Sequence, residues 1–224
     1  MTYKVKVFLV MFLLAAITSN SGCIKEECSV GGGYEFVVPA TLSPALRTYR
    51  IGDTITIRSA FEHDVYELKT ERTYRLENFR FFPSTEIKKI DEDPIQNSLS
   101  PFEIIVAPTF DYEILTFSSG NQALVGEYNY NGTFYTLEYQ LIPKQTGLFY
   151  LEQGISTDLD EDQGFEAKCN NVDISVGKVS MNNDADNNID LFNDIPDTEF
   201  GAWILGRPEW NFQWFGGYVI EVVE

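Results

Sequence analysis

Two alternating segments joined by an Asn-Gly dipeptide constrain the fold of this chain more than any other feature. Residues 123–130 and 134–142 flank Asn131-Gly132, a dipeptide that readily accepts the positive φ angles of a hairpin turn. Apolar and largely polar residues alternate in the second segment: Tyr135, Leu137, Tyr139 and Leu141 share one parity, and Phe134, Thr136, Glu138 and Gln140 share the other. The pattern predicts a β-hairpin with one buried face and one exposed face.

Shorter segments of the same kind recur along the chain. In residues 49–61, Ile51, Ile55 and Ile57 share one parity. Further strands are expected at residues 34–38, 102–107, 112–117, 148–151, 172–176 and 217–223. No segment longer than about 12 residues has the apolar stripe of a helix, and the best helical candidate is the brief segment 188–192. Strands spaced roughly 8–12 residues apart between Gly, Pro and Asn turns predict an all-β fold, which we expect to be a single antiparallel sandwich.

The segment from Pro143 to Leu151 resembles the turn and strand that close immunoglobulin-like extracellular domains. A tyrosine usually occupies the corner position in that family, and Phe149 or Tyr150 would lie near it here. The resemblance implies an immunoglobulin-like sandwich. A domain boundary near residue 155 is the alternative, but it would leave only a marginally sized second domain.

The N-terminus has the composition of an export leader. Lys4 and Lys6 precede an apolar run over residues 7–17, which is shorter than the roughly 20 residues of a transmembrane helix. A run of this length suits a signal peptide that is removed after export. Ser21 and Gly22, both small, precede Cys23 in the order that a lipoprotein peptidase requires.

These residues resemble the leader of a Bacteroidetes-type surface lipoprotein. Asn20 stands where the usual lipobox has Leu, a departure that this group tolerates, and Lys25-Glu26-Glu27 is similar to its surface-export signal. The resemblance implies a lipidated Cys23 and anchoring in the outer membrane, at the cell surface; a periplasm-facing protein is the alternative. The expected plan is a signal peptide over 1–22, a tether over 23–33 and the β-sandwich over 34–224.

Charge is distributed unevenly. Removal of the two leader lysines takes the formal net charge from −18 to −20. Residues 23–89 carry 10 basic and 10 acidic side chains, whereas residues 90–224 carry 4 and 24. Such a field repels phosphate backbones, so nucleic acid is not an expected partner. It favours cations, either Ca²⁺ or a basic partner.

Lipidation of Cys23 would leave two other cysteines, Cys28 and Cys169. The compartment beyond the inner membrane permits disulfides. A Cys28–Cys169 bridge would close a long loop, worth about 4–5 kcal/mol in the chain-entropy model. Two separate thiols are the alternative.

Two acidic loops offer oxygen ligands at alternate positions. The carboxylates are Asp158, Asp160 and Asp162 in the first loop and Asp184, Asp186 and Asp190 in the second. Ca²⁺ takes roughly six to eight oxygen ligands, so each loop is a candidate calcium site. Neither is an EF-hand, because Cys169 and Ile195 stand where the bidentate glutamate would be. Solvated acidic loops are the alternative.

All three tryptophans lie within residues 203–214. Exposed aromatic rings stack on sugar faces, but large aromatics more often fill cores. Arg207 to Trp210 is typical of a loop, so Trp210 is the member most expected to be exposed. Trp203 and Trp210 are therefore candidate ligand-binding residues. A core strand through Phe212 and Trp214 is the alternative.

Catalytic motifs are missing from the sequence. The only histidine is His63, and neither Gly-x-Ser-x-Gly nor His-Glu-x-x-His occurs. The 34 acidic residues offer many carboxylate pairs without a motif. The sequence favours a non-enzymatic envelope lipoprotein, a binding or structural module for a glycan, peptide or envelope-protein ligand. A carboxylate-based extracytoplasmic hydrolase is the alternative.

Overall fold

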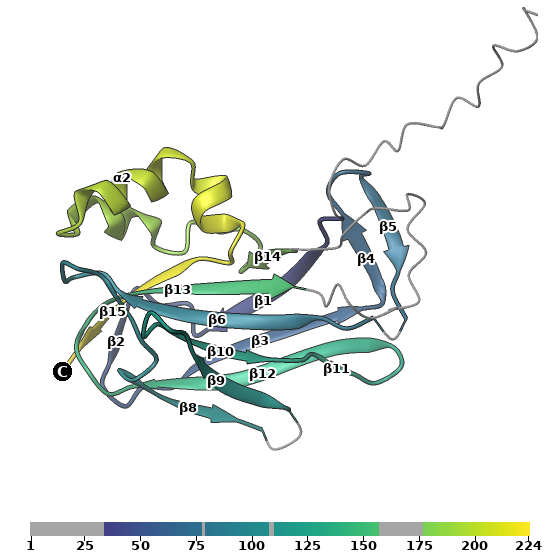
Figure 1. Ribbon diagram of the computed structural model, residues 1–224, viewed down its shortest axis with the longest axis horizontal. Coiled ribbons are helices and arrows are strands. Elements are labelled where there is room, and N and C mark those ends of the chain that lie inside the picture. Colours follow the sequence, from purple (N-terminus) through teal and green to yellow (C-terminus); the bar gives the residue numbers. More distant parts are fainter. Residues whose placement is uncertain (1–33, 78, 108–109, 157–176) are drawn as a thin grey trace, which may run out of the picture.

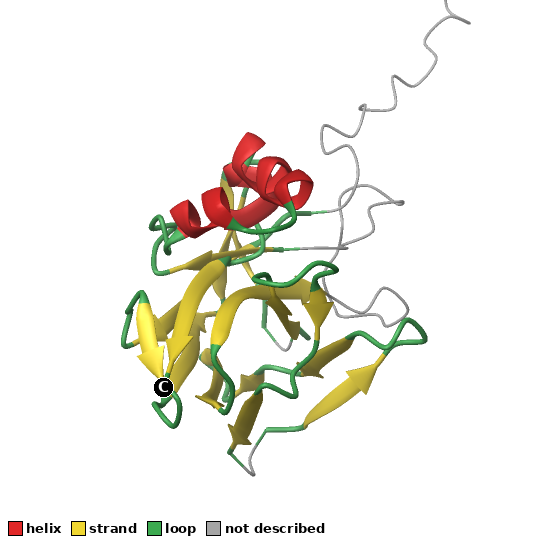
Figure 2. Ribbon diagram, turned by 90° about the vertical axis from the view of Figure 1, so that its left-hand side faces the viewer, coloured by secondary structure: helices red, strands yellow, loops and turns green. Residues whose placement is uncertain are grey.

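The alternating segments form two β-sheets packed face to face, and short helices cover the outer face of one of them (Figure 1; Figure 2). The computed structural model describes residues 34–77, 79–107, 110–156 and 177–224. The all-β sandwich is confirmed. No helix in these ranges is long and apolar enough to cross a membrane.

The first sheet is centred on two long antiparallel strands. The longer of the two, residues 134–143, has three strands on one side, and two short strands share its other edge. In order, its members are β11 (Asn129–Tyr130) together with β8 (Phe102–Val106), β12 (Phe134–Pro143), β3 (Ile55–Glu62), β1 (Val37–Ser43) and β14 (Lys178–Met181).

The second sheet is centred on two long strands, β13 (Gly147–Ser156) and β6 (Phe82–Lys89). In order, its members are β2 (Thr48–Arg50), β15 (Tyr218–Val223), β13 (Gly147–Ser156), β6 (Phe82–Lys89), β10 (Gln122–Gly126) and β9 (Tyr112–Thr116), with β7 (Gln96–Asn97) also on β6. A separate hairpin joins β4 (Asp64–Glu67) to β5 (Arg72–Arg75).

The sheets are mixed, not wholly antiparallel as expected. β1 pairs with β14 in parallel, and β15 pairs with β2 in parallel. Both pairs join segments far apart in sequence, as parallel pairing requires a long crossover. β14 and β15 both follow residue 155 and lie in different sheets, so this part of the chain belongs to the sandwich.

Period-two alternation is confirmed in the first sheet. The apolar set on β12 is buried between the sheets, and Ile55 and Ile57 on β3 join it. Ile51 is an exception: it is 45% exposed. Gly52, at a φ of 89°, turns the chain between Ile51 and β3, so the predicted alternation does not extend through Ile51.

The predicted Asn-Gly hairpin is confirmed only near its turn. β11 pairs with β12, but residues 122–126 cross to the second sheet as β10 and pair with β6 and β9. Only Gly132 of the dipeptide has a positive φ, 95°. The Asn131 side chain instead accepts hydrogen bonds from the main-chain N–H groups of Thr133 and Phe134, at 3.0 and 2.8 Å.

Three short helices form the layer over the second sheet: the 3₁₀-helix η1 (Ile189–Asp194), the α-helix α2 (Thr198–Gly206) and the π-helix η2 (Glu209–Gln213). The helical candidate at 188–192 overlaps η1. Helix α2 was not predicted, although Asp197 caps it by accepting from the Phe200 N–H at 2.9 Å. The alternative of a core strand through Phe212 and Trp214 is confirmed only for the burial of Phe212, because Phe212 lies in η2 and not in a strand.

Residue Tyr150 connects the second sheet to the helices. β13 begins at Gly147, directly after the turn that resembles an immunoglobulin-like corner. Phe149 points into the core between the sheets, whereas Tyr150 points into the helical layer. There the Tyr150 ring stacks on Phe212 at 5.6 Å and meets Phe192 edge-on at 5.1 Å. Around Phe149 and Tyr150, β13 is therefore apolar on both faces.

Candidate functional site

Several predicted site residues lie outside the described residues. They are the lipidation candidate Cys23, the disulfide candidates Cys28 and Cys169, and the first acidic loop with Asp158, Asp160 and Asp162. Lipidation, the disulfide and a calcium site in that loop remain predictions.

The second acidic loop does not gather its carboxylates. Asp184 pairs with Lys178 at 2.5 Å, and Asp190 receives two hydrogen bonds of 2.8 Å from Arg47. Asp186 is exposed. Within the described ranges, no group of three His, Cys, Asp or Glu side chains is placed to hold a metal ion.

The asparagines of that loop connect strands of both sheets. Asn182 accepts from the Leu42 N–H of β1 at 3.0 Å, and Asn188 donates to the Val219 carbonyl of β15 at 2.9 Å. Asn187, almost fully buried, donates to the Met181 carbonyl at 3.1 Å. All three have left-handed φ angles, which asparagine tolerates better than most residues. The loop is therefore a structural connection between the sheets.

Trp203 and Trp210 both lie on the helical layer and are 52% and 58% exposed. Trp203 belongs to α2 and stacks on Phe200 at 5.8 Å. Trp210 belongs to η2 and stacks on Trp214 at 5.1 Å. Trp203 lines a groove whose lining does not include Trp210, so the structure does not bring the two candidates together in that groove.

The groove beside Trp203 has a volume of about 360 Å³. Its floor is formed by residues of β6 and β13, and its aromatic members are Trp203 and Phe215. We call it the Trp203 groove; its lining residues are Ser84, Glu86, Glu152, Gly154, Ile155, Ser156, Trp203 and Phe215. A β-carbon at position 154 would lie 2.7 Å from the Ser84 hydroxyl, so glycine keeps this floor open.

Two carboxylates lie side by side on the floor. Glu152 and Glu86 are direct cross-strand partners. Lys88 forms an ion pair with Glu152, and its ammonium lies 5.5 Å from the centre of the Tyr150 ring. The Asn97 amide donates to Glu86 at 2.5 Å. Burial raises the pKa of Tyr150 well above its ordinary value, and the nearby Glu152 carboxylate raises it further.

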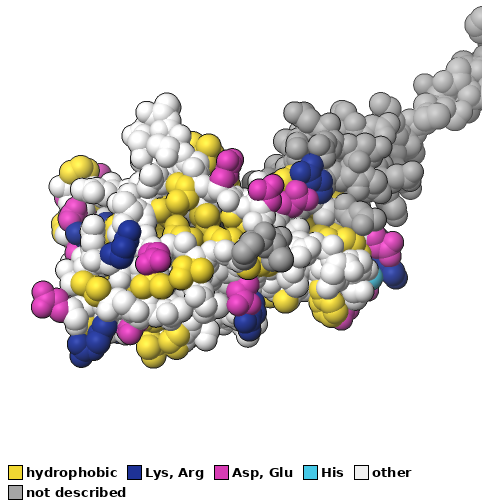
Figure 3. Space-filling view, turned by 90° about the horizontal axis from the view of Figure 1, so that it is seen from below, with side chains coloured by type: hydrophobic (Ala, Val, Ile, Leu, Met, Phe, Trp, Pro, Cys, Tyr) yellow, Lys and Arg dark blue, Asp and Glu magenta, His cyan; other side chains and the backbone are white. Residues whose placement is uncertain are grey.

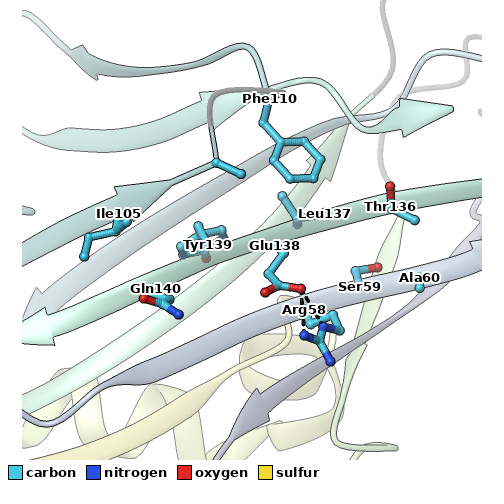
Figure 4. A pocket seen from close by; sticks show the side chains of 11 residues that line it. Arg58, Ser59, Ala60, Ile105, Phe110, Thr136, Leu137, Glu138, Tyr139 and Gln140 are labelled. Atoms are coloured by element: carbon cyan, nitrogen blue, oxygen red, sulfur yellow. Dashed lines mark hydrogen bonds and ion pairs between the residues drawn. The ribbon is translucent and has the colours of Figure 1, made fainter.

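A larger groove, of about 510 Å³, lies on the outer face of the first sheet. Figure 4 shows Arg58 and Glu138 pointing toward each other across it, with Phe110 from the β8–β9 connection above the strands. The guanidinium donates twice to one Glu138 oxygen, with Arg58 Nε and Nη2 both at 2.7 Å. Arg58 and Glu138 therefore neutralise each other within this groove. Its larger volume alone does not make it a better candidate for ligand binding than the Trp203 groove.

The side of the molecule opposite the helices, where β8 and β9 lie, carries several hydrophobic side chains (Figure 3). The large exposed ones on and beside these strands are Ile105, Ile114, Leu115 and Phe117. They lie outside the Trp203 groove.

The sequence pointed to Trp203 but not to the polar floor. Ser84 and Glu86 alternate with buried Thr85 and Ile87, a pattern that indicates an exposed face of β6. Their juxtaposition with Glu152 depends on the pairing of β6 with β13, which local patterns do not reveal.

Comparisons with known proteins found distant structural likenesses only. No protein-family profile and no curated protein matches the chain. The human F-spondin reeler domain is similar at 11% identity and a TM-score of 0.33, covering 59% of this chain and 85% of that one. A cohesin from Archaeoglobus fulgidus reaches 12% and 0.29, covering 67% and 86%. The collagen-binding domain of a Staphylococcus aureus adhesin reaches 10% and 0.24, covering 66% and 95%. At these TM-scores, none assigns a family or a ligand to the chain.

Proposed function

We propose that this protein is a non-enzymatic saccharide-binding module and that the Trp203 groove is its binding site. The observation that carries the proposal is a half-exposed indole beside a polar floor. Sugars present flat faces of C–H groups and rims of hydroxyls. An aromatic ring covers such a face, while a few placed polar groups fix the orientation. Here Ser84, Glu86 and Glu152 supply hydroxyl and carboxylate oxygens next to the indole.

Several contacts hold Trp203 in place before a ligand arrives. Its ring stacks on Phe200, and its carbonyl accepts a hydrogen bond of 2.6 Å from the Asn211 amide. At Gly201, a β-carbon would lie 2.7 Å from the Phe192 carbonyl oxygen, so the glycine allows α2 to pack closely on η1. A preorganised aromatic side chain loses little conformational freedom on binding, which favours affinity.

Glycoside hydrolysis is the second candidate function, because Glu86 and Glu152 lie side by side. Glycosidases use a pair of carboxyl groups flanking the scissile bond. Binding is the better proposal, because Glu152 is engaged by Lys88 and the groove is an open surface feature. Release of reducing ends by the native protein but not by Glu86→Gln or Glu152→Gln would establish hydrolysis instead.

Lipidation of Cys23 and display at the outer-membrane surface are part of the proposal. They rest on the leader and on Lys25-Glu26-Glu27. Each buried acyl CH₂ contributes about 0.8 kcal/mol, and a di- or triacylated cysteine anchors a protein stably. Cys23→Ser should move the protein from the detergent phase to the aqueous phase. A variant that stays in the detergent phase would disprove this anchor.

Calorimetric titration with neutral oligosaccharides tests the binding site. We expect Trp203→Ala to weaken binding at least about tenfold, because truncating a central aromatic contact usually costs more than about 1.4 kcal/mol. The matched control is Trp210→Ala, which removes an equally exposed tryptophan outside the groove. Equal affinities of native protein and Trp203→Ala, with both folded, would contradict the proposal.

A further inference from the structure

We infer that the Trp203 groove is selective for amino sugars that carry a free, protonated amine and that it rejects sugars that carry a carboxylate. The inference rests on the proposed saccharide-binding function. It concerns the charge of the ligand, which that function leaves open.

The local charge of the groove is the first argument. Two of its lining residues, Glu86 and Glu152, are acidic and none is basic. Among the described residues, the ammonium group of Lys88 reaches this floor and pairs with Glu152. Two carboxylates and one ammonium leave an excess negative charge beside Trp203. A cationic ligand group completes this arrangement, whereas an anionic one meets repulsion.

The protein's own structure shows how the floor binds an ammonium. The Lys88 ammonium contacts the Glu152 carboxylate and lies over the ring of Tyr150, the cross-strand partner of Lys88. Carboxylate and aromatic face together favour a cation. On the groove side, Glu86 and Trp203 offer the same two kinds of group to a ligand amine.

The direct pairing of Glu86 with Glu152 is the second argument. Like charges directly opposite on neighbouring strands destabilise a sheet. A bound ammonium relieves that repulsion, so the ligand amine gains more than an exposed contact would give. The surrounding charge acts in the same direction, since residues 90–224 carry 24 acidic and 4 basic side chains.

The experiment is a titration with three oligosaccharides of equal length: a glucosamine oligomer with free amines, its fully N-acetylated counterpart and a galacturonate oligomer. We expect the amine-bearing oligomer to bind about tenfold more tightly than the acetylated one, and the galacturonate not measurably. Added salt should reduce the preference. Glu86→Gln should bring the ratio of the affinities for the amine-bearing and the acetylated oligomers to about one. The matched control Glu113→Gln removes the same charge from exposed β9 and should change nothing.

The outcomes separate the two proposals. Equal binding of all three oligomers would overturn the charge selectivity and leave saccharide binding intact. No binding of any oligomer would overturn both. Undiminished binding of the amine-bearing oligomer to Trp203→Ala would show attraction to the acidic surface in general and would overturn the assignment to this groove.

Discussion

Glu86 on β6 and Glu152 on β13 are direct cross-strand partners, and both line the Trp203 groove. Of the two, Glu152 has the ion pair with Lys88, whose side chain is only 20% exposed. The two glutamates therefore contribute differently to stability, although they share one surface.

Replacing Glu86 should stabilise the free protein. Glu86→Gln removes the repulsion and keeps an oxygen for the Asn97 amide, so we expect a gain of about 0.2–1 kcal/mol in the free energy of unfolding. Glu152→Gln is the comparison: it leaves Lys88 without its carboxylate partner and should lower stability. Urea unfolding of both variants measures this. A less stable Glu86→Gln would show that the pair is not repulsive.

Glu67 should contribute stability that depends on pH. Its fully buried carboxylate accepts from the N–H groups of Glu35, Lys69 and Thr70 at 2.8, 3.2 and 2.7 Å, and from the Thr70 hydroxyl at 2.6 Å. Burial acts to raise the pKa of Glu67, but these hydrogen bonds outweigh it and lower the pKa. The stabilisation is therefore complete above the unfolded value of about 4.3 and is lost as the pH falls through the lowered folded value.

Glu67→Gln tests this dependence. At neutral pH we expect it to cost about 1–3 kcal/mol, because hydrogen bonds to a buried charge are lost. The difference from the native protein should shrink as the pH falls below about 4. Exposed Glu62→Gln is the control. Chemical unfolding across this pH range decides, and a difference independent of pH would refute the role of the charge.

Asn187 should be important to the loop between β14 and η1. Asn187→Ala removes the hydrogen bond to the Met181 carbonyl and leaves a β-carbon at a φ of 47°. We expect it to cost about 1–3 kcal/mol. Asn187→Gly also loses the amide, but glycine adopts this positive φ without strain. The difference in stability between the two variants therefore measures the cost of holding a residue with a β-carbon in this backbone conformation. If both variants melt like the native protein, the loop is not a connection between the sheets.

Seven tyrosine hydroxyls should ionise late in alkaline titration. Burial is the main cause that raises the pKa of each: Tyr49, Tyr112, Tyr128, Tyr135, Tyr139, Tyr150 and Tyr218. The pKa of Tyr49 rises to about 12. Because the folded values exceed the unfolded value of about 10, the resulting stability is complete below that pH and is lost above it. Tyrosinate absorbance should show a late phase together with loss of near-ultraviolet circular dichroism. Ionisation of all tyrosines while that signal persists would contradict the burial.

The inward and outward faces of β12 and β3 could be predicted because side chains alternate along any strand. Which sheet a strand joins is a different matter. Residues 123–130 look like one strand in the sequence, yet β10 and β11 lie in opposite sheets. Alternation shows which face of a strand is buried but not which strand it pairs with. The passage of the chain from one sheet to the other between β10 and β11 could therefore not be predicted.

The candidate site was predictable only in its aromatic half. The clustering of tryptophans singled out Trp203, but Trp210 shared that signal and lies outside the groove. Glu86 and Glu152 meet through strand register, which no local pattern encodes. The second acidic loop was misread for a similar reason. The spacing of Asp184 and Asp190 suggested a metal site, but each carboxylate pairs with a basic side chain. Lys178 lies just before the loop and Arg47 is distant in sequence, so the spacing of the acidic residues did not reveal either pair.

The most direct test follows the three tryptophan indole N–H signals by NMR while an amine-bearing oligosaccharide is added. Trp203 should shift in proportion to saturation, while Trp210 and Trp214, which stack on each other outside the groove, should stay in place. Trp203→Ala assigns the signal. Saturating sugar that leaves the Trp203 signal unmoved, or that moves only Trp210 and Trp214, would contradict the assignment of the Trp203 groove as the saccharide site.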